Sequence, residues 1–200
     1  MPMSAVTAWQ ALFVQTGSVL KAEAGTGAKG KRVFITAASG AVGRWMVQLA
    51  KWAGADVVGT ASGAAMEVVK CLGAGEVLDY RSADVKAWAT EEKKADVVID
   101  CIGGKSLQDS WWVVKKNGVL ISVNDVPEGK KPEGVEEGIK SLFFVMEANG
   151  EQLEKITKLI DAGGFVGSLD STWKLEDGPK AVEKLESGKA KGKIVFNLLA

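Results

Sequence analysis

Short apolar segments alternate with longer amphipathic ones along most of the chain. The apolar segments are rich in β-branched residues and lie near 33–37, 56–60, 76–79, 96–101, 118–123 and 141–146. The segments between them have helical periodicity and lie near 42–53, 63–72, 83–92, 104–115 and 150–162. This alternation predicts an α/β fold with a doubly wound parallel sheet. Because several strand segments are continuously apolar, we expect helices on both faces of the sheet.

The residues between these segments support the same architecture. Gly54, Gly73 and Gly118 each follow a predicted helix, where a left-handed C-terminal cap is expected. Residues 124–138 contain two prolines, three glycines and seven charged residues, which predicts an exposed loop. The final part of the chain is predicted to form a strand from Phe165, a helix over 177–187 and a strand over 193–199.

Composition and charge limit the classes of function. The 200 residues are 46% hydrophobic, which is enough for a sizeable core. Lys+Arg and Asp+Glu are balanced at 25 each and the basic residues are scattered, so no nucleic-acid partner is expected. No apolar run approaches the roughly 18 residues of a membrane span, and the first residues lack the features of a secretion signal. We therefore expect no membrane partner and a cytoplasmic location.

The residue types that carry most catalytic chemistry are scarce. The chain has no histidine, which removes Ser-His-Asp and Cys-His catalysis and the commonest zinc ligand, so no metal site is expected. Cys71 and Cys101 lie in apolar segments and are interpreted as buried, inert thiols. Most tryptophans fall on predicted helices and are interpreted as core residues. Of the adjacent pair Trp111 and Trp112, only one can face inward.

A glycine-containing turn joins the first of these strands to the helix near 42–53. It is formed by Ala38, Ser39, Gly40, Ala41, Val42 and Gly43. In a dinucleotide-binding turn, Gly40 would let the backbone approach a pyrophosphate and Gly43 would let the helix pack closely on the strand. The helix N-terminus would then supply free N–H groups. A plain tight turn could share this pattern, but the strand, helix and second strand around it favour dinucleotide binding in a Rossmann fold.

The end of the second strand bears on the choice of nucleotide. An acidic residue there would hydrogen-bond the ribose 2′-hydroxyl of NAD and repel a 2′-phosphate. Ala61 and Ser62 occupy this place, which favours NADP, although no Lys or Arg follows at once and NAD remains an alternative. Tyr80 and Arg81, after the third strand, are either close to the adenosine end of the cofactor or a solvated pair in a loop.

Taken in order, several phrases of the chain resemble one protein family. They are MSAVTAWQALF, GKRVFITAASGAVGRWMVQLAKWAGADVVGTAS, LGAGEVLDYRS, ADVVIDCIGG, FFVMEANGEQL and ESGKAKGKIV. Together they resemble the medium-chain dehydrogenase/reductase superfamily, in its zinc-independent, quinone-oxidoreductase-like branch, over essentially the whole chain. The resemblance implies that NADPH is the preferred cofactor and that the reaction is hydride transfer to a quinone, an enone or another activated carbonyl.

The resemblance also implies roles for individual residues. The turn 38–43 would take the pyrophosphate, and Thr7 would lie by the nicotinamide ribose. Ser62 and Tyr80 would face the adenosine 2′-phosphate, with Lys193 as a further candidate phosphate partner. The nicotinamide half would be lined by Gly103, Val123, Phe143, Phe144 and Val145. No catalytic side chain can be assigned from these residues.

Residues 1–200 are expected to form a single Rossmann domain. By the resemblance, 1–30 would be a junction helix and lead-in, 31–163 the core sheet, and 164–200 a segment that packs on a GroES-like domain absent from this chain. One wall of a cleft cannot hold a substrate over the nicotinamide and exclude water, so enzyme activity would need a partner chain. The alternatives are a non-catalytic nucleotide-binding module and a truncated fragment. Exposed sheet edges would favour a homodimer.

Overall fold

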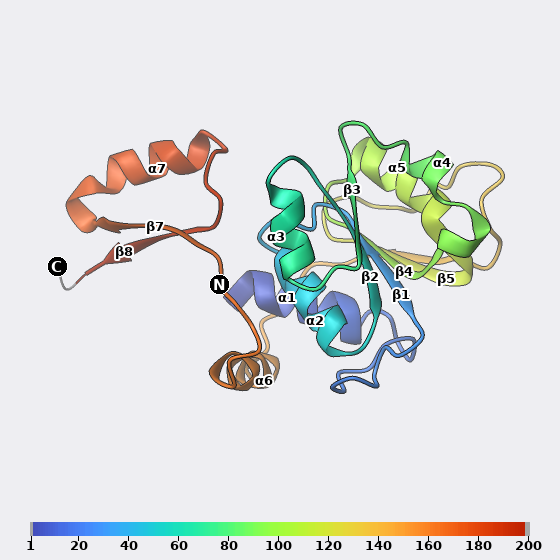
Figure 1. The fold of residues 1–200 in the computed structure, drawn as a ribbon, viewed down its shortest axis with the longest axis horizontal. Coiled ribbons are helices and arrows are strands. Elements are labelled where there is room, and N and C mark those ends of the chain that lie inside the picture. The colour runs from blue at the N-terminus through green and yellow to red at the C-terminus, as the bar shows by residue number, and fades with distance from the viewer. Residues whose placement is uncertain (1, 199–200) are drawn as a thin grey trace. The chain divides into compact units, whose positions relative to one another are not determined.

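The computed structural model describes residues 2–198, which fall into two compact units. The first unit runs from residue 2 to residue 153, and the second begins at residue 154. Figure 1 labels the helices and strands of both units, which are described one at a time.

The first unit is built on a six-stranded parallel sheet with the strand order β3-β2-β1-β4-β5-β6. Its strands are β1 Arg32–Ile35, β2 Asp56–Ala61, β3 Glu76–Asp79, β4 Ala95–Asp100, β5 Val114–Ser122 and β6 Lys140–Phe143. The chain winds outward from β1 to β3 and then returns to the other side of β1 with β4. This is the order of a Rossmann fold, so the predicted fold class is confirmed.

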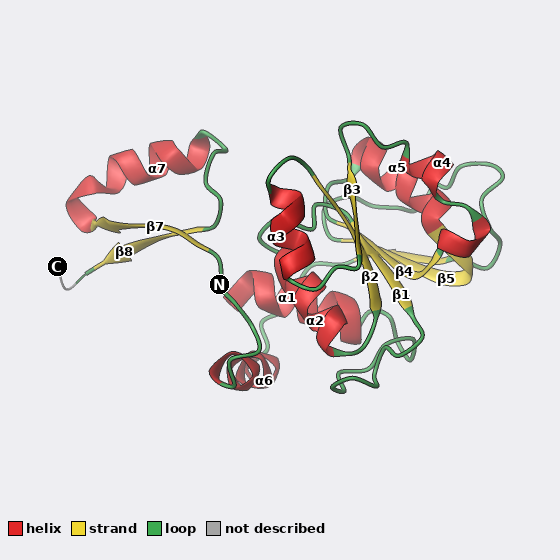
Figure 2. Ribbon diagram, viewed as in Figure 1, coloured by secondary structure: helices red, strands yellow, loops and turns green. Residues whose placement is uncertain are grey.

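Helices cover both faces of this sheet, as predicted (Figure 2). One face carries α1 Pro2–Phe13, α2 Gly43–Trp52 and α3 Ala65–Cys71, and the other carries α4 Val85–Trp88 and α5 Gly104–Val113. Helices α1 and α2 pack through aromatic rings, with the centroids of Trp9 and Trp52 6.4 Å apart. Helix α6, Gly150–Asp161, begins in the first unit and ends in the second.

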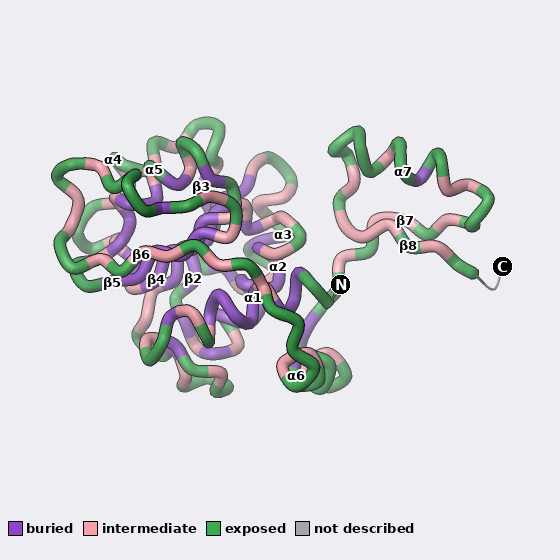
Figure 3. Tube along the Cα trace, turned by 180° about the vertical axis from the view of Figure 1, so that it is seen from behind, coloured by how far each residue is buried: buried purple, intermediate pink, exposed green. Residues whose placement is uncertain are grey.

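The core of the first unit follows the central strands, where Figure 3 shows the buried positions gathered. Val33, Phe34 and Ile35 of β1 are completely buried, and Phe34 packs in one apolar cluster with Trp111 of α5. The neighbouring Trp112 is half-buried, and the ammonium of Lys86 lies 3.7 Å from its ring centroid. The prediction that only one tryptophan of this pair faces inward is confirmed.

Three predicted elements have different limits in the structure. The helix expected over 83–92 is broken into α4 and a 3-10 turn at Glu91–Lys93, because Ala89 adopts a non-helical conformation at the end of α4. Strand β5 begins at Val114, earlier than expected, because Val114 already pairs with Ala95. The strand expected over 141–146 ends at Phe143, which pairs with Ser122, the last residue of β5.

Two predictions about single residues are wrong. Gly118 is not a left-handed cap: Asn117 takes that conformation, with φ of 60°. Gly118 serves close packing instead, because an added Cβ would lie 2.7 Å from Val114 Cγ1. Cys71 is exposed rather than buried, because it lies in the last turn of α3. Burial, followed by the charge of Asp100, raises the pKa of the Cys101 thiol to about 12, so this thiol stays protonated.

The second unit contains a small parallel sheet of two strands, β7 Leu169–Lys174 and β8 Lys193–Asn197. A 3-10 turn, Leu175–Asp177, and helix α7, Gly178–Glu186, connect them, so the predicted strand, helix and strand are present. Lys184 of α7 forms an ion pair of 2.5 Å with Asp170 of β7. The hydrogen bond from Lys184, followed by that from the Lys191 N–H, holds the pKa of Asp170 well below its usual range.

Candidate functional site

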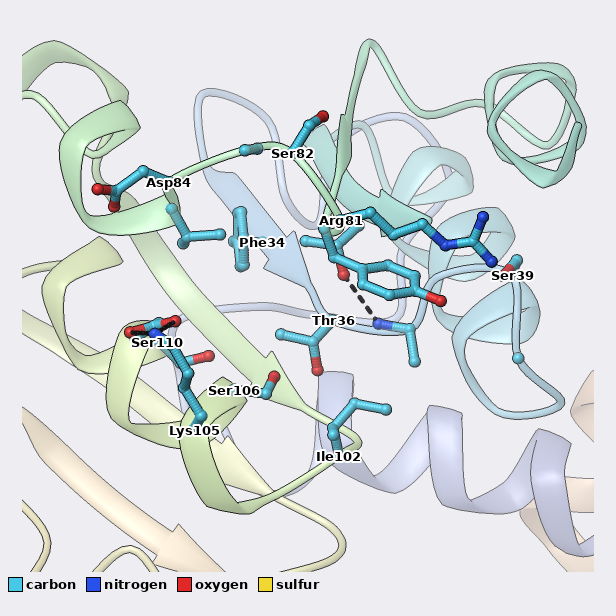
Figure 4. Close-up of a pocket in the computed structure, with 17 residues that line it drawn as sticks. Phe34, Thr36, Ser39, Arg81, Ser82, Asp84, Ile102, Lys105, Ser106 and Ser110 are labelled. Atoms are coloured by element: carbon cyan, nitrogen blue, oxygen red, sulfur yellow. Dashed lines mark hydrogen bonds and ion pairs between the residues drawn. The ribbon is translucent and has the colours of Figure 1, made fainter. Parts of the chain in front are cut away.

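A cavity of about 770 Å³ lies at the carboxyl ends of β1, β2 and β4 in the first unit (Figure 4). Its walls come from the end of β1 and the turn after it, the segment after β3, and α5. The lining residues are Phe34, Thr36, Ala37, Ser39, Gly40, Thr60, Tyr80, Arg81, Ser82, Ala83, Asp84, Val85, Ile102, Lys105, Ser106, Asp109 and Ser110. The cavity therefore lies where the strand order reverses, the position at which open α/β sheets bind ligands.

The glycine-containing turn is fixed to the sheet by hydrogen bonds to β2. The N–H of Ala37 donates to Thr60 Oγ1 at 3.1 Å, and the N–H of Ala38 donates to the Thr60 carbonyl at 2.9 Å. Ala37 has a positive φ of 48°, and the N–H of Gly40 closes the turn on the Ala37 carbonyl at 2.8 Å. Thr60 is thus a positioning residue that the sequence pattern did not single out.

The turn leaves no room for a side chain at Gly43. An added Cβ there would lie 2.3 Å from the Ala37 carbonyl oxygen and 2.7 Å from Ala38 Cα. At Gly40 the nearest atom, the Ala37 carbonyl oxygen, would be at 3.1 Å. Helix α2 therefore starts in close contact with the end of β1, as it does in dinucleotide-binding turns.

The first N–H groups of α2 are available to a ligand. No side chain caps the helix at Val42. Within residues 2–198, the N–H groups of Ala41, Val42 and Gly43 have no hydrogen-bond acceptor. Arg44 strengthens the turn, since its Nε donates to the Ser39 carbonyl at 2.7 Å. Free N–H groups with the positive end of the helix dipole favour an anionic group at this place.

A buried carboxylate orders the loop between β4 and α5. Asp100 is completely buried and accepts hydrogen bonds from Thr36 Oγ1 at 3.0 Å, Ser106 Oγ at 2.7 Å and the Gly103 N–H at 2.6 Å. These bonds join β1, β4 and α5 beneath the cavity. Asp100 and Thr36 are not among the site residues predicted from the sequence. The available signal was an acid at the end of an apolar strand, separated from a glycine pair by Cys101 and Ile102.

The structure brings Ser62, Tyr80 and Arg81 together at one side of the cavity. Ser62 follows the last residue of β2, and Tyr80 follows the last residue of β3. The hydrogen bond with Ser62, then the hydrogen bond and charge of Arg81, lower the pKa of the Tyr80 phenol. The Arg81 guanidinium carbon lies 5.9 Å from the centroid of the Tyr80 ring. An exposed phenol and a guanidinium therefore face the solvent side of this site.

Of the predicted site residues, Ser39, Gly40 and Tyr80 line the cavity itself. Gly103 and Val123 follow β4 and β5, and the segment 143–145 begins at the last residue of β6. These residues therefore lie at the same edge of the sheet but outside this lining. Thr7 is in α1, where its hydroxyl donates to the Met3 carbonyl at 2.7 Å. Lys193 is the first residue of β8, in the second unit. The remaining predicted residues outside the lining are Ala38, Ala41, Val42, Gly43 and Ser62.

A family model described as zinc-binding dehydrogenase matches residues 72–196, more than half of the chain. The chain belongs to this family. It is a member of the medium-chain dehydrogenase/reductase superfamily and is quinone-oxidoreductase-like, as the resemblance implied.

Several known proteins are similar to this family member along its whole length. It is 47% identical over 202 residues to a probable zinc-binding oxidoreductase, mitochondrial, of Arthroderma benhamiae, covering 99% of this chain and 61% of the relative. It is 32% identical to the NAD(P)H oxidoreductase RTN4IP1, mitochondrial, of Mus musculus, covering 100% of this chain and 54% of the relative. The solved quinone oxidoreductase from Coxiella burnetii superposes with a TM-score of 0.82 at 27% identity, covering 99% of this chain and 59% of that one. The chain therefore spans between half and two thirds of the length of these relatives.

The family description mentions zinc, but the described residues offer no ligand set for it. No group of three or more Cys, Asp or Glu side chains in the described part of the chain could hold a metal ion, and the sequence has no histidine. None of the helices described is both long enough and apolar enough to span a membrane.

Proposed function

We propose that the cavity at the carboxyl ends of β1 and β4 binds a nicotinamide dinucleotide. The observation that carries this proposal is the position of the cavity at the strand-order reversal, directly beside the turn at Ser39 and Gly40. The free N–H groups of Ala41, Val42 and Gly43 would receive the pyrophosphate. The name of the mouse relative, an NAD(P)H oxidoreductase, supports the same cofactor class.

Within this proposal, NADPH is favoured over NADH by the residues at the adenosine end. Strand β2 ends at Ala61 and is followed by Ser62, so no acid stands where it would repel a 2′-phosphate. Ser62 and Tyr80 supply hydroxyl groups, and Arg81 supplies the nearby positive charge. A guanidinium suits phosphate recognition because its donors form a planar fork.

The proposed reaction is reduction of a quinone, an enone or another activated carbonyl compound, and the family and the quinone oxidoreductase neighbour support this class. When bound, the reduced nicotinamide would supply the hydride. In this chain, the turn at 38–43 and the loop that Asp100 orders would hold the cofactor. They would cover one side of the cofactor. The substrate needs a second wall that excludes water. We propose that this second wall comes either from a region equivalent to the part of the relatives that this chain does not cover, or from a partner chain.

Calorimetric titration of the 200-residue chain with NADPH and then with NADH tests the proposal. We expect saturable binding of both, tighter for NADPH. The chain must first be shown to be folded, for example by its cooperative thermal unfolding. Absence of binding to either nucleotide would overturn the proposal. Binding without oxidation of NADPH in the presence of quinones or enones would support a nucleotide-binding module that needs a partner for catalysis.

We also propose that the chain associates with a second copy through exposed strand edges. Strands β7 and β8 have only each other as neighbours in the described part of the second unit. Unpaired strand edges favour pairing with another chain. Concentration-dependent sedimentation would detect such an assembly, and its absence would leave the chain a monomer.

A further inference from the structure

A buried hydroxyl in the wall of the cavity has no hydrogen-bond partner within residues 2–198. Ser110 on α5 is 1% exposed and lines the cavity, yet its Oγ neither donates nor accepts a hydrogen bond there. Trp111 Nε1 shares this condition, but it lies in the apolar core cluster and outside the cavity lining. Buried polar groups in folded proteins nearly always have a partner, so the cavity is where a partner for Ser110 must come from.

The neighbouring polar side chains on α5 are already engaged. Ser106 donates to Asp100 at 2.7 Å, and Asp109 accepts from the Lys105 ammonium at 2.6 Å. Around Ser110 the lining also includes Phe34, which is completely buried, and Val85. This end of the cavity therefore combines apolar walls with a single unused hydroxyl. That combination suits a flat, apolar ring with polar atoms at its edge.

The order of residues along the cavity indicates which part of a dinucleotide reaches Ser110. Figure 4 shows Ser39 and Arg81 at one side of the cavity and Ser110 and Asp84 at the other. With the pyrophosphate at the turn and the 2′-phosphate near Arg81, the remaining part of the adenosine half is the adenine ring. Adenine is joined to ribose through N9, so the opposite edge, with N1 and the 6-amino group, enters the cavity first.

Resting on the proposed function, we infer that Ser110 Oγ hydrogen-bonds the N1 and 6-amino edge of the adenine ring and makes this pocket specific for that base. A serine hydroxyl can donate to N1 and accept from the amino group. Ser110 is a specificity-determining residue in this inference, and it touches the cofactor far from the reacting atoms.

Titration with NADP⁺ and with its 1,N⁶-etheno analogue tests the inference, because the etheno bridge removes the N1 lone pair and the N–H groups of this edge. We expect the wild-type chain to bind NADP⁺ about three- to tenfold more tightly than the analogue, the range of one buried hydrogen bond. Ser110→Ala is expected to bind NADP⁺ more weakly by the same factor and to bind the two ligands equally. Equal affinities in the wild type, or an unchanged ratio in Ser110→Ala, would overturn the inference.

Two controls separate a base contact from a structural effect. Ser18→Ala removes an exposed hydroxyl outside the cavity lining and is expected to keep the wild-type ratio. Without ligand, Ser110→Ala is expected to melt no lower than the wild type, because the lost hydroxyl has no partner there. Failure of the wild type to bind either dinucleotide would refute the proposed function itself, whereas binding with an unchanged ratio in Ser110→Ala refutes only the role of Ser110.

Discussion

Gly43 leaves no space for a side chain where α2 meets β1. We expect Gly43→Ala to reduce the free energy of unfolding by about 1–3 kcal/mol, since its Cβ would overlap the backbone of Ala37 and Ala38, which cannot rotate away. Urea denaturation measures this change. Gly178→Ala is the matched control, because an added Cβ there meets no atom within 4 Å. Equal stability of the two variants would show that the turn is not tightly packed.

Arg81 tests the charge at the adenosine end. In the proposed complex its guanidinium faces the 2′-phosphate, so Arg81→Ala should weaken NADPH binding about tenfold, the effect of one charge-assisted hydrogen bond at an exposed site. NADH, which lacks this phosphate, should bind as it does to the wild type. Lys86→Ala removes a charge from the ring face of Trp112, outside the cavity lining, and should change neither affinity. Calorimetry measures all of these, and an equal loss for NADPH and NADH would refute the role of Arg81.

Single residues differ in how well sequence alone locates them. The turn at 38–43 was found because glycine spacing between a strand and a helix has a local cause. Thr60 and Asp100 were missed because their roles depend on partners elsewhere in the fold: Asp100, for example, accepts from Thr36, far earlier in the chain. Ser110 was missed because no sequence pattern marks a serine whose hydroxyl is buried without a hydrogen-bond partner.

Asp96 joins the beginnings of three strands, β1, β4 and β5. It accepts from the Arg32 N–H at 2.9 Å and from the ammonium groups of Lys31 at 3.4 Å and Lys115 at 3.2 Å. Partial burial raises the pKa of Asp96, but the Arg32 N–H and the two lysines outweigh it, so the net pKa is lowered. The carboxylate therefore contributes stability in full above the unfolded pKa of about 4, and this contribution is lost as pH falls through the lower folded value.

Asp96→Asn should therefore lower the free energy of unfolding by about 1–3 kcal/mol at pH 7, and the difference from the wild type should shrink as pH falls below about 4. Urea denaturation across this pH range measures the effect. Glu67→Gln breaks only the exposed pair with Lys70 and should change stability by less than about 0.5 kcal/mol. A difference between Asp96→Asn and the wild type that is constant with pH would show that the carboxylate's charge is not what stabilises these strand ends.

The elements themselves were predictable where a long pattern repeats. The six strands and their alternation with helices follow from continuous apolar runs, and the strand order confirms them. The strand ends that differ from the prediction are set by pairing with neighbouring strands. Strand β6 stops where β5 ends, and β5 starts at Val114 because this residue pairs with Ala95. The region 83–92 has helical periodicity, but Val85 and Trp88 pack against the core cluster while the chain leaves the helix at Ala89.

The second unit exposes seven large apolar side chains among its described residues. They are Val166, Leu169, Leu175, Val182, Leu185, Val195 and Leu198. The sequence predicted strand, helix and strand here but could not show how much apolar surface would remain, because that depends on what each residue meets in space. A single domain over residues 1–200 stays a prediction.

Strand β8 has no neighbour other than β7 in the described part of the second unit, so its other edge is unpaired there. If two copies pair through strand edges, Val195→Lys should weaken self-association several-fold, about 1 kcal/mol, because a charged lysine on an edge strand opposes pairing. Sedimentation at several concentrations measures the association. Val182→Lys makes the same change at a similarly exposed position, 49% against 44%, but on α7, and should leave association unchanged. If Val182→Lys disrupts the assembly and Val195→Lys does not, the copies meet through the helix and not through the strand edge.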